Sequence, residues 1–394
     1  MKKLGEVMDF KVTNSFSRGN LNYEYGTVKN IHYGDIHTKF QTLFDINCES
    51  VPFINEEIDI SRISDENYCK NGDIIFADAS EDLNDVGKSI EIINTNGEKL
   101  LSGLHTLLAR PKEDIFHLGF SGYLFKSNSV RTQIQKESQG SKVLSINVGR
   151  ISKVELSFPS VEEQSKISSF LALLDERIQT QSKIIEGLEK LKVATAKKIF
   201  SQEFRFKDNN GNDFSKWEEM KLKNIVIIQM GQSPDSSSYN FENIGIPLIQ
   251  GNADILNRKS NPRQYTSKPT KFCDVGDLLL TVRAPVGYVG KSKHYACIGR
   301  GICSVKNNDK SILEFIYQFL LYFEDKWKSI EQGSTFTAVN SSDINSINIL
   351  LPSIPEQTKI ANFLSAIDSK IDMENQLLQK LEEQKKYLLQ NMFV

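Results

Sequence analysis

Residues 158–178 read FPSVEEQSKISSFLALLDERI, and residues 351–371 read LPSIPEQTKIANFLSAIDSKI. The two stretches lie 193 residues apart, and a comparison of 159–200 with 352–393 gives 14 identical positions without a gap. Both copies open with Ser-x-x-Glu, the capping-box pattern in which a serine hydroxyl and a glutamate carboxylate satisfy the first free amides of a helix. The sequence therefore predicts an internal duplication that contains two long helices.

Apolar residues recur along both predicted helices in alternating steps of three and four, which is the seam of a coiled coil. Two polar pairs break this pattern at matching places: Gln181 with Glu374, and Lys192 with Lys385. The helices are therefore expected to share one packing geometry and to pack on each other. Each run of about 40 residues would form a rod of about 60 Å. The predicted packing residues are Ile167, Leu171, Leu174, Ile178, Leu188, Ile360, Leu364, Ile367, Ile371 and Leu381.

A globular stretch precedes each predicted helix. Both stretches contain short β-branched and aromatic runs separated by Gly, Asn and Asp turns, with helical patterns near 116–138 and 311–332. The predicted class is α+β, with two mixed α/β domains that repeat one unit. The shared motifs are QGS at 139–141 and 332–334, GDI or GDL at 72–74 and 276–278, and VGKS at 86–89 and 289–292.

These patterns also predict the domain boundaries. Because the two domains differ where their loops fall, they are typical of one scaffold that carries different recognition loops. We predict domains at 1–158 and 217–351, helices at 159–203 and 352–394, and a polar linker at 204–216.

The composition is that of a folded, water-soluble protein: 394 residues, 39% hydrophobic, 25% charged, with a mean hydropathy of -0.35. Apolar runs are too short to span a bilayer, and the start MKKLGEVMDF lacks the apolar core of a signal peptide. We therefore expect a cytoplasmic protein without a membrane partner. The five cysteines form no CxxC pair and no zinc-finger spacing, so we expect reduced thiols and no metal site.

Catalytic motifs are missing from the sequence. Gly-Lys-Ser occurs twice, but a phosphate-binding loop needs a glycine five positions before that Gly, where Asp82 and Pro285 stand. The carboxylates of ASEDLND (79–85) have no counterpart in the second half, so we interpret them as a solvated turn. We predict no catalytic residues.

The net charge of -2 is unevenly distributed. Residues 1–159 carry 18 basic and 22 acidic groups, whereas 258–310 carry 11 basic groups against three aspartates. This local excess is sufficient for a phosphate-binding surface. The alternative is that these lysines and arginines only form a solvated face.

The duplicated unit of globular domain and helix resembles the specificity subunit of Type I restriction-modification systems. The resemblance covers nearly the whole chain, and its specific part is the repeated Pro-x-x-x-Glu-Gln-x-Lys-Ile at the start of each helix. It implies two target recognition domains and an antiparallel coiled coil that separates them and helps to hold two modification (methyltransferase) subunits. It also implies a bipartite, asymmetric DNA target with a gap of fixed length, and half-sites roughly 10 bp apart.

In such a complex this chain would be non-catalytic. S-adenosylmethionine, ATP and Mg would be bound by the modification and restriction/translocase subunits, and no cofactor by this chain. Two other hypotheses stay open: a fused methyltransferase or nuclease, and a coiled-coil scaffold without direct DNA readout.

Candidate DNA contacts fall in both domains, chosen because cations bind phosphates, and Asn or Gln can pair with adenine. In the acidic first domain, either Asp78 and Ser80 accept from cytosine or binding depends on charge from partner subunits. The first-domain candidates are Arg18, Tyr33, His37, Lys39, Asp78, Ser80, Lys88, Ser141 and Lys142. The second-domain candidates are Gln232, Ser233, Gln250, Asn252, Arg258, Lys259, Arg283, Tyr288, Lys291, Lys293 and Arg300.

Overall fold

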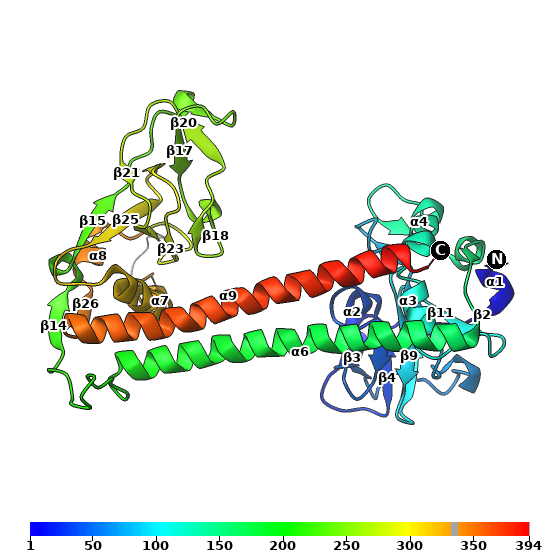
Figure 1. Cartoon of the computed structure of the whole chain (residues 1–394). Coiled ribbons are helices and arrows are strands. Elements are labelled where there is room, and N and C mark those ends of the chain that lie inside the picture. The colour runs from blue at the N-terminus through cyan, green and yellow to red at the C-terminus, as the bar shows by residue number, and fades with distance from the viewer. Residues whose placement is uncertain (332–337, 394) are drawn as a thin grey trace. The chain divides into compact units, whose positions relative to one another are not determined.

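The computed structural model of the chain describes residues 1–331 and 338–393. The predicted motif Gln332-Gly333-Ser334 lies outside the described residues. The chain divides into two compact units, Met1–Lys183 with Gln376–Val394 (unit 1) and Ile184–Asn375 (unit 2). Each unit holds one sheet-rich half and a stretch of both long helices, which confirms the predicted α+β class (Figure 1). Because the long helices contribute to both units, the units cut across the sequence segments, and the predicted domain boundaries stay predictions.

The two repeated segments form the long helices α6 (Val161–Phe200) and α9 (Ile354–Asn391). Acidic residues lie in the first turn of each helix, where their negative charge interacts favourably with the positive end of the helix dipole. In the first copy the backbone N of Glu163 donates to Ser160 Oγ at 3.4 Å, which is one half of the predicted capping box.

The second copy has a different helix start, and here the predicted capping box is wrong. Glu356 is fully buried and accepts hydrogen bonds from Arg205 and, at 3.0 Å, from Trp217 Nε1. Ser353 Oγ is buried and has no partner among the described residues. A guanidinium and an indole N–H thus replace the backbone amide as donors to Glu356, because the segment between the two halves folds over the start of α9.

Unit 1 contains a five-stranded and a four-stranded sheet. The first has the order β2 (Met8–Lys11), β11 (Thr106–Pro111), β7 (Ile74–Ala77), β9 (Ser89–Asn94), β5 (Leu43–Asp45). The second has the order β10 (Lys99–Ser102), β4 (Val28–Ile31), β6 (Phe53–Ile54), β3 (Leu21–Asn22). Two small pairs join β1 (Lys2–Lys3) to β13 (Glu155–Leu156) and β8 (Ala79–Ser80) to β12 (Leu144–Ser145). The helices are α1 (Leu4–Val7), α2 (Tyr33–Thr38), α3 (Phe120–Leu124), α4 (Asn128–Glu137) and α5 (Val148–Ile151).

Unit 2 also contains two larger sheets, and each has one strand more than its counterpart in unit 1. A six-stranded sheet has the order β15 (Val226–Met230), β25 (Ile302–Asn307), β22 (Leu278–Thr281), β23 (Val289–Lys291), β19 (Lys259–Ser260), β18 (Ile255–Leu256). A five-stranded sheet has the order β16 (Tyr239–Asn240), β20 (Gln264–Thr266), β17 (Ile246–Ile249), β24 (Ala296–Ile298), β21 (Phe272–Cys273). β14 (Glu218–Lys221) pairs with β26 (Asn348–Leu351), and the helices are α7 (Leu313–Glu331) and α8 (Ser341–Asn345).

Strand register corrects one predicted equivalence, the VGKS motif. In unit 1, Ile74 pairs with Glu91 across β7 and β9, and in unit 2 Leu278 pairs with Lys291 across β22 and β23. Because GDI and GDL align at the start of β7 and β22, Lys291 takes the place of Glu91, three residues beyond Lys88. The two glycines of the motif also differ, since Gly87 has φ +66 in a turn whereas the second Gly lies within β23.

The repeated glutamine joins each helix start to its sheet-rich half. Gln164 is fully buried, and its Nε2 donates to Pro159 O and Ile115 O, both at 3.0 Å. Its Oε1 accepts from His117 N at 2.9 Å. The second copy repeats all three bonds: Gln357 Nε2 donates to Pro352 O and Lys310 O, and Gln357 Oε1 accepts from Ile312 N.

The repeated aspartate and lysine form a second joint. Asp175 on α6 pairs with Lys385 on α9 and accepts from Tyr123 Oη of α3 at 2.9 Å. The polar breaks at Lys192 and Lys385 are thus half-buried members of interhelical ion pairs. The start of one helix pairs with the end of the other, so α6 and α9 run antiparallel. In unit 2 the same joint consists of Asp368, Lys192 and Gln318 of α7.

The predicted packing residues face the interiors of the units. Leu171 belongs to the unit 1 core with Phe120 and Tyr123, and Ile360 and Leu364 belong to the unit 2 core. The heptad positions therefore pack on the sheet-rich halves as well as on the other helix. Leu174 and Leu381 are buried, and Ile167, Ile178, Leu188, Ile367 and Ile371 are half-buried.

Candidate nucleic-acid interface

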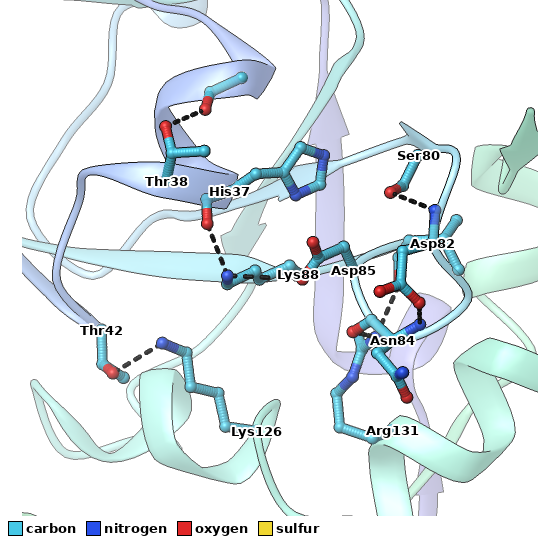
Figure 2. Close-up of polar contacts among 12 residues, drawn as sticks. His37, Thr38, Thr42, Ser80, Asp82, Asn84, Asp85, Lys88, Lys126 and Arg131 are labelled. Atoms are coloured by element: carbon cyan, nitrogen blue, oxygen red, sulfur yellow. Dashed lines mark hydrogen bonds and ion pairs between the residues drawn. The ribbon is translucent and has the colours of Figure 1, made fainter. Parts of the chain in front are cut away.

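The loop that follows β7 gathers several first-half candidates. His37 Nε2 donates to Ala79 O at 3.0 Å, and Lys88 Nζ donates to His37 O at 2.7 Å. Ser80 Oγ accepts from Asp82 N at 3.0 Å within the same loop. Figure 2 shows the Lys88 amino group at the carbonyl of His37, and Ser80 beside Asp82 within the 79–85 loop. The carboxylate-rich turn 79–85 therefore has an ordered conformation and lies beside His37.

An aromatic group borders the same loop. Tyr33 contacts His37 and His105 edge to face, with ring centroids 5.9 and 5.3 Å apart. His105 Nδ1 lies 3.2 Å from Asp78 Oδ1, and burial raises the pKa of Asp78 above its usual range. We call the following residues the first-half cluster: Tyr33, His37, Asp78, Ser80 and Lys88.

The remaining first-half candidates are placed differently. Arg18 and Lys39 share the fully buried Asp35, with nitrogen–oxygen distances of 2.7 and 3.1 Å, so two cations are balanced by one carboxylate. Both cations keep about half of their side chains exposed. Ser141 and Lys142 lie in an exposed turn that leads into β12, which pairs with β8 of the cluster loop.

Three loops meet in unit 2 around close-packed glycines. Arg300 N donates to Ser233 Oγ at 3.1 Å, and a Cβ on Gly299 would lie 3.2 Å from both Ser233 Oγ and the Cα of Gln250. Val282 N donates to Gly301 O at 3.0 Å, which ties the segment carrying Arg283 to the same place. The side chains on these loops include two glutamine amides, a serine hydroxyl and two arginines. We call the following residues the second-half cluster: Gln232, Ser233, Gln250, Arg283 and Arg300.

Other second-half candidates are held by partners inside the chain. Arg258 forms a bidentate pair with Glu324 and stacks 4.1 Å from the centroid of Tyr288. Lys291 pairs with Glu314 and lies 4.2 Å from the Tyr317 ring centroid.

Three further candidates are placed as follows. Lys259 pairs with Asp372 at 3.3 Å, and Lys293 is exposed. Asn252 Oδ1 is buried without a hydrogen-bond partner among the described residues.

Two cations next to the first-half cluster escaped the sequence analysis. Lys126 Nζ donates to Thr42 Oγ1 at 2.7 Å, and Arg131 Nη2 donates to Asn84 O and Val86 O at 2.9 and 2.8 Å (Figure 2). Both lie in or next to α4, but nothing in the local sequence shows that Arg131 contacts the 79–85 loop or that Lys126 contacts Thr42.

In residues 1–331 and 338–393 there is no group of three or more His, Cys, Asp or Glu side chains placed to hold a metal ion. Across the same described part of the chain, no helix is long and apolar enough to cross a membrane.

Comparisons with known protein sequences give matches over most of the chain. The family model for the Type I restriction modification DNA specificity domain matches residues 1–190 and 214–383. A putative type I restriction enzyme MjaX specificity subunit of Methanocaldococcus jannaschii is 35% identical over 329 residues, which cover 81% of this chain and 76% of that protein. The MjaVIII specificity subunit of the same organism is 25% identical over 68% of each chain.

Two solved structures share the fold. A chain from a structural study of complex assembly and conformational transition of the type I R-M system has a TM-score of 0.63 at 21% identity, covering 98% of this chain and 95% of that chain. The Type-I restriction-modification S subunit from M. genitalium has a TM-score of 0.60 at 16% identity, covering 100% of this chain and 95% of that chain.

Proposed function

Because the chain belongs to the Type I restriction-modification DNA specificity family, whose members are the non-catalytic subunits, we propose that it reads a bipartite, asymmetric DNA target for its complex. Each sheet-rich half would read one part of the target, and the two parts would be separated by a gap of fixed length. Two modification subunits, and restriction/translocase subunits where present, would perform methylation and cleavage. S-adenosylmethionine, ATP and Mg would be bound by those partners.

One observation carries this proposal: the two halves share their joints but differ in their candidate contact surfaces. The Gln164 and Gln357 bonds and the Asp175 and Asp368 joints repeat one another. The first-half cluster contains an aromatic ring, a histidine and a carboxylate, whereas the second-half cluster contains amides and arginines. Unlike donor and acceptor sets on a repeated scaffold favour unlike half-sites.

The second-half cluster supplies the sharper test, because Arg283 and Arg300 are exposed and make no ion pair with any residue that the structure describes. Arginine is the side chain most often used to read guanine in the major groove. Lys291 is a poor choice for this test, since its pair with Glu314 is part of the fold.

The experiment is methylome sequencing of a host that expresses the chain with its modification subunit. We expect a gapped, asymmetric methylated motif that requires this chain. Arg283→Ala with Arg300→Ala should relax or remove one half of the motif and leave the other half intact. The control, Lys223→Ala with Lys310→Ala, removes the same charge from exposed positions outside the cluster and should leave the motif unchanged. An intact complex that writes no motif would instead favour a scaffold without DNA readout.

A further inference from the structure

A basic pocket in unit 1 lies beside the first-half cluster. It has a volume of about 460 Å³ and lies between the start of α4, α6 and the last turns of α9. Four cations line it against the single carboxylate of Glu382. Its lining cations are Lys126, Arg131, Lys385 and Lys386.

The charge of this pocket is incompletely balanced. Lys385 pairs with Asp175, but Arg131 Nη1 is buried without a partner among the described residues. Burial, together with Lys385, Lys88 and Arg131 nearby, lowers the pKa of Lys126 to about 7. A buried cation surrounded by other cations is costly unless an anion joins it. The pocket is therefore suited to an anion.

The scaffold does not require this charge. Lys385 has its counterpart in the first copy as Lys192, because both lysines form the interhelical joints. Lys386 is replaced at the matching position by Val193, which is exposed. The unit 2 joint aligns Tyr123 with Gln318, so Lys126 matches Leu321. Two of the pocket cations thus belong to the first half alone, as expected of a ligand site and not of a folding device.

Two features identify the ligand class. The first turn of α4 has no side-chain cap, so its free amides add donors for an anion at the pocket edge. Arg131 also holds the 79–85 loop of the first-half cluster through Asn84 O and Val86 O, which makes the pocket continuous with that surface. The sequence of the first domain is net acidic, so this pocket concentrates the cations that DNA binding needs.

We propose that this pocket binds a backbone phosphate of the DNA half-site read by the first half. The proposal rests on the proposed function. Under this proposal the first half does not depend on partner subunits for positive charge, because Lys126 and Lys386 provide it from within the chain.

The test compares the assembled complex of this chain and its modification subunit with a Lys126→Met, Lys386→Gln variant. Binding to a duplex carrying the methylated motif is measured by fluorescence anisotropy between 50 and 200 mM salt. Loss of one phosphate contact should reduce the steepness of log affinity against log salt concentration by about 0.9. Across this fourfold range of salt, the affinity of the variant should then fall about 3.5-fold less than that of the wild type. Lys380→Gln, an exposed α9 lysine outside the pocket, is the control and should keep the wild-type slope.

A second arm identifies the source of the phosphate. Duplexes with a single neutral methylphosphonate are scanned across the first half-site. Wild type should lose affinity at one linkage where the variant does not. An unchanged salt slope and identical scans, with the motif still written, would overturn the pocket proposal and leave the proposed function standing. Competition by inorganic phosphate that depends on Lys126, without any methylphosphonate effect, would also overturn it, since the site would then hold a free anion.

Discussion

Neutralising Asp175 should weaken unit 1 more than neutralising its counterpart Asp368 weakens unit 2. In unit 1 the carboxylate is 16% exposed and its partner Lys385 is 20% exposed, so the pair is largely dry. Breaking a buried pair from one side costs about 3–5 kcal/mol, and partial exposure places Asp175→Asn near the lower end, at about 3 kcal/mol. Asp368 is 35% exposed, so Asp368→Asn should cost about half as much.

The environment increases this difference. Without Asp175, Lys385 would be left facing the cations of the basic pocket, whereas in unit 2 the positions that match Lys126 and Lys386 hold the uncharged Leu321 and Val193. Lys385→Met should therefore recover much of the loss caused by Asp175→Asn, with a coupling of about 2 kcal/mol in a double-mutant cycle.

The assay must resolve the two units, because a chain with two units does not unfold in one step. Native-state hydrogen exchange followed by mass spectrometry reports local opening free energies. Peptides from α3 and β9 should lose about 3 kcal/mol in Asp175→Asn, and peptides from α7 and β22 should change by less than about 0.5 kcal/mol. Equal effects of Asp175→Asn and Asp368→Asn, or additive effects of Asp175→Asn and Lys385→Met, would refute the reasoning. Tyr123→Phe, which removes only the hydroxyl, should cost about 1 kcal/mol.

Three further predictions follow from buried charges. Burial raises the pKa of Glu91 to about 7, so the folded state keeps a proton that the unfolded state releases near pH 4.5. The stability of unit 1 should therefore fall by up to about 3 kcal/mol as the pH rises from about 4.5 to about 7. Hydrogen-exchange measurements should show a weaker pH dependence in Glu91→Gln. Glu356→Ala should cost about 3 kcal/mol in unit 2 because it leaves the half-buried guanidinium of Arg205 and the buried indole N–H of Trp217 without their acceptor. Glu163→Ala, at the matching exposed position, should change urea-dependent exchange by less than about 0.5 kcal/mol. Arg258→Lys cannot keep the bidentate pair and the ring stacking, so it should destabilise unit 2 by about 1–2 kcal/mol without altering the methylated motif.

The long helices could be predicted because their signals are local and repeated. The Ser-x-x-Glu motif and the seven-residue period each lie within a single segment, and the same residues recur at one offset, although the second motif does not form the predicted capping box. Even the polar breaks at Lys192 and Lys385 pointed to a shared geometry, although their aspartate partners could not be identified without the antiparallel register.

The sites were harder to predict because their partners are distant in sequence. Arg258 looks like a free cation until Glu324, 66 residues away, is placed beside it. Lys126 and Arg131 were not predicted as site residues, since each falls near an ordinary helix start and only the fold brings them to Thr42 and to the 79–85 loop. The VGKS match failed because four residues of common turn composition do not determine strand register.

The positions of the glutamine joints also determine where recombination can exchange one half of the chain without breaking a joint. Every hydrogen-bond partner of the Gln164 side chain lies between residues 115 and 159, and every partner of the Gln357 side chain lies between 310 and 352. The joint of each half is therefore inherited with that half. The interhelical pairs join the two copies, but the same aspartate and lysine occur in both. Recombination with breakpoints inside the repeated segments would deliver a foreign recognition half already fitted with its attachment, so new DNA specificities could arise without redesign of the helices that receive them.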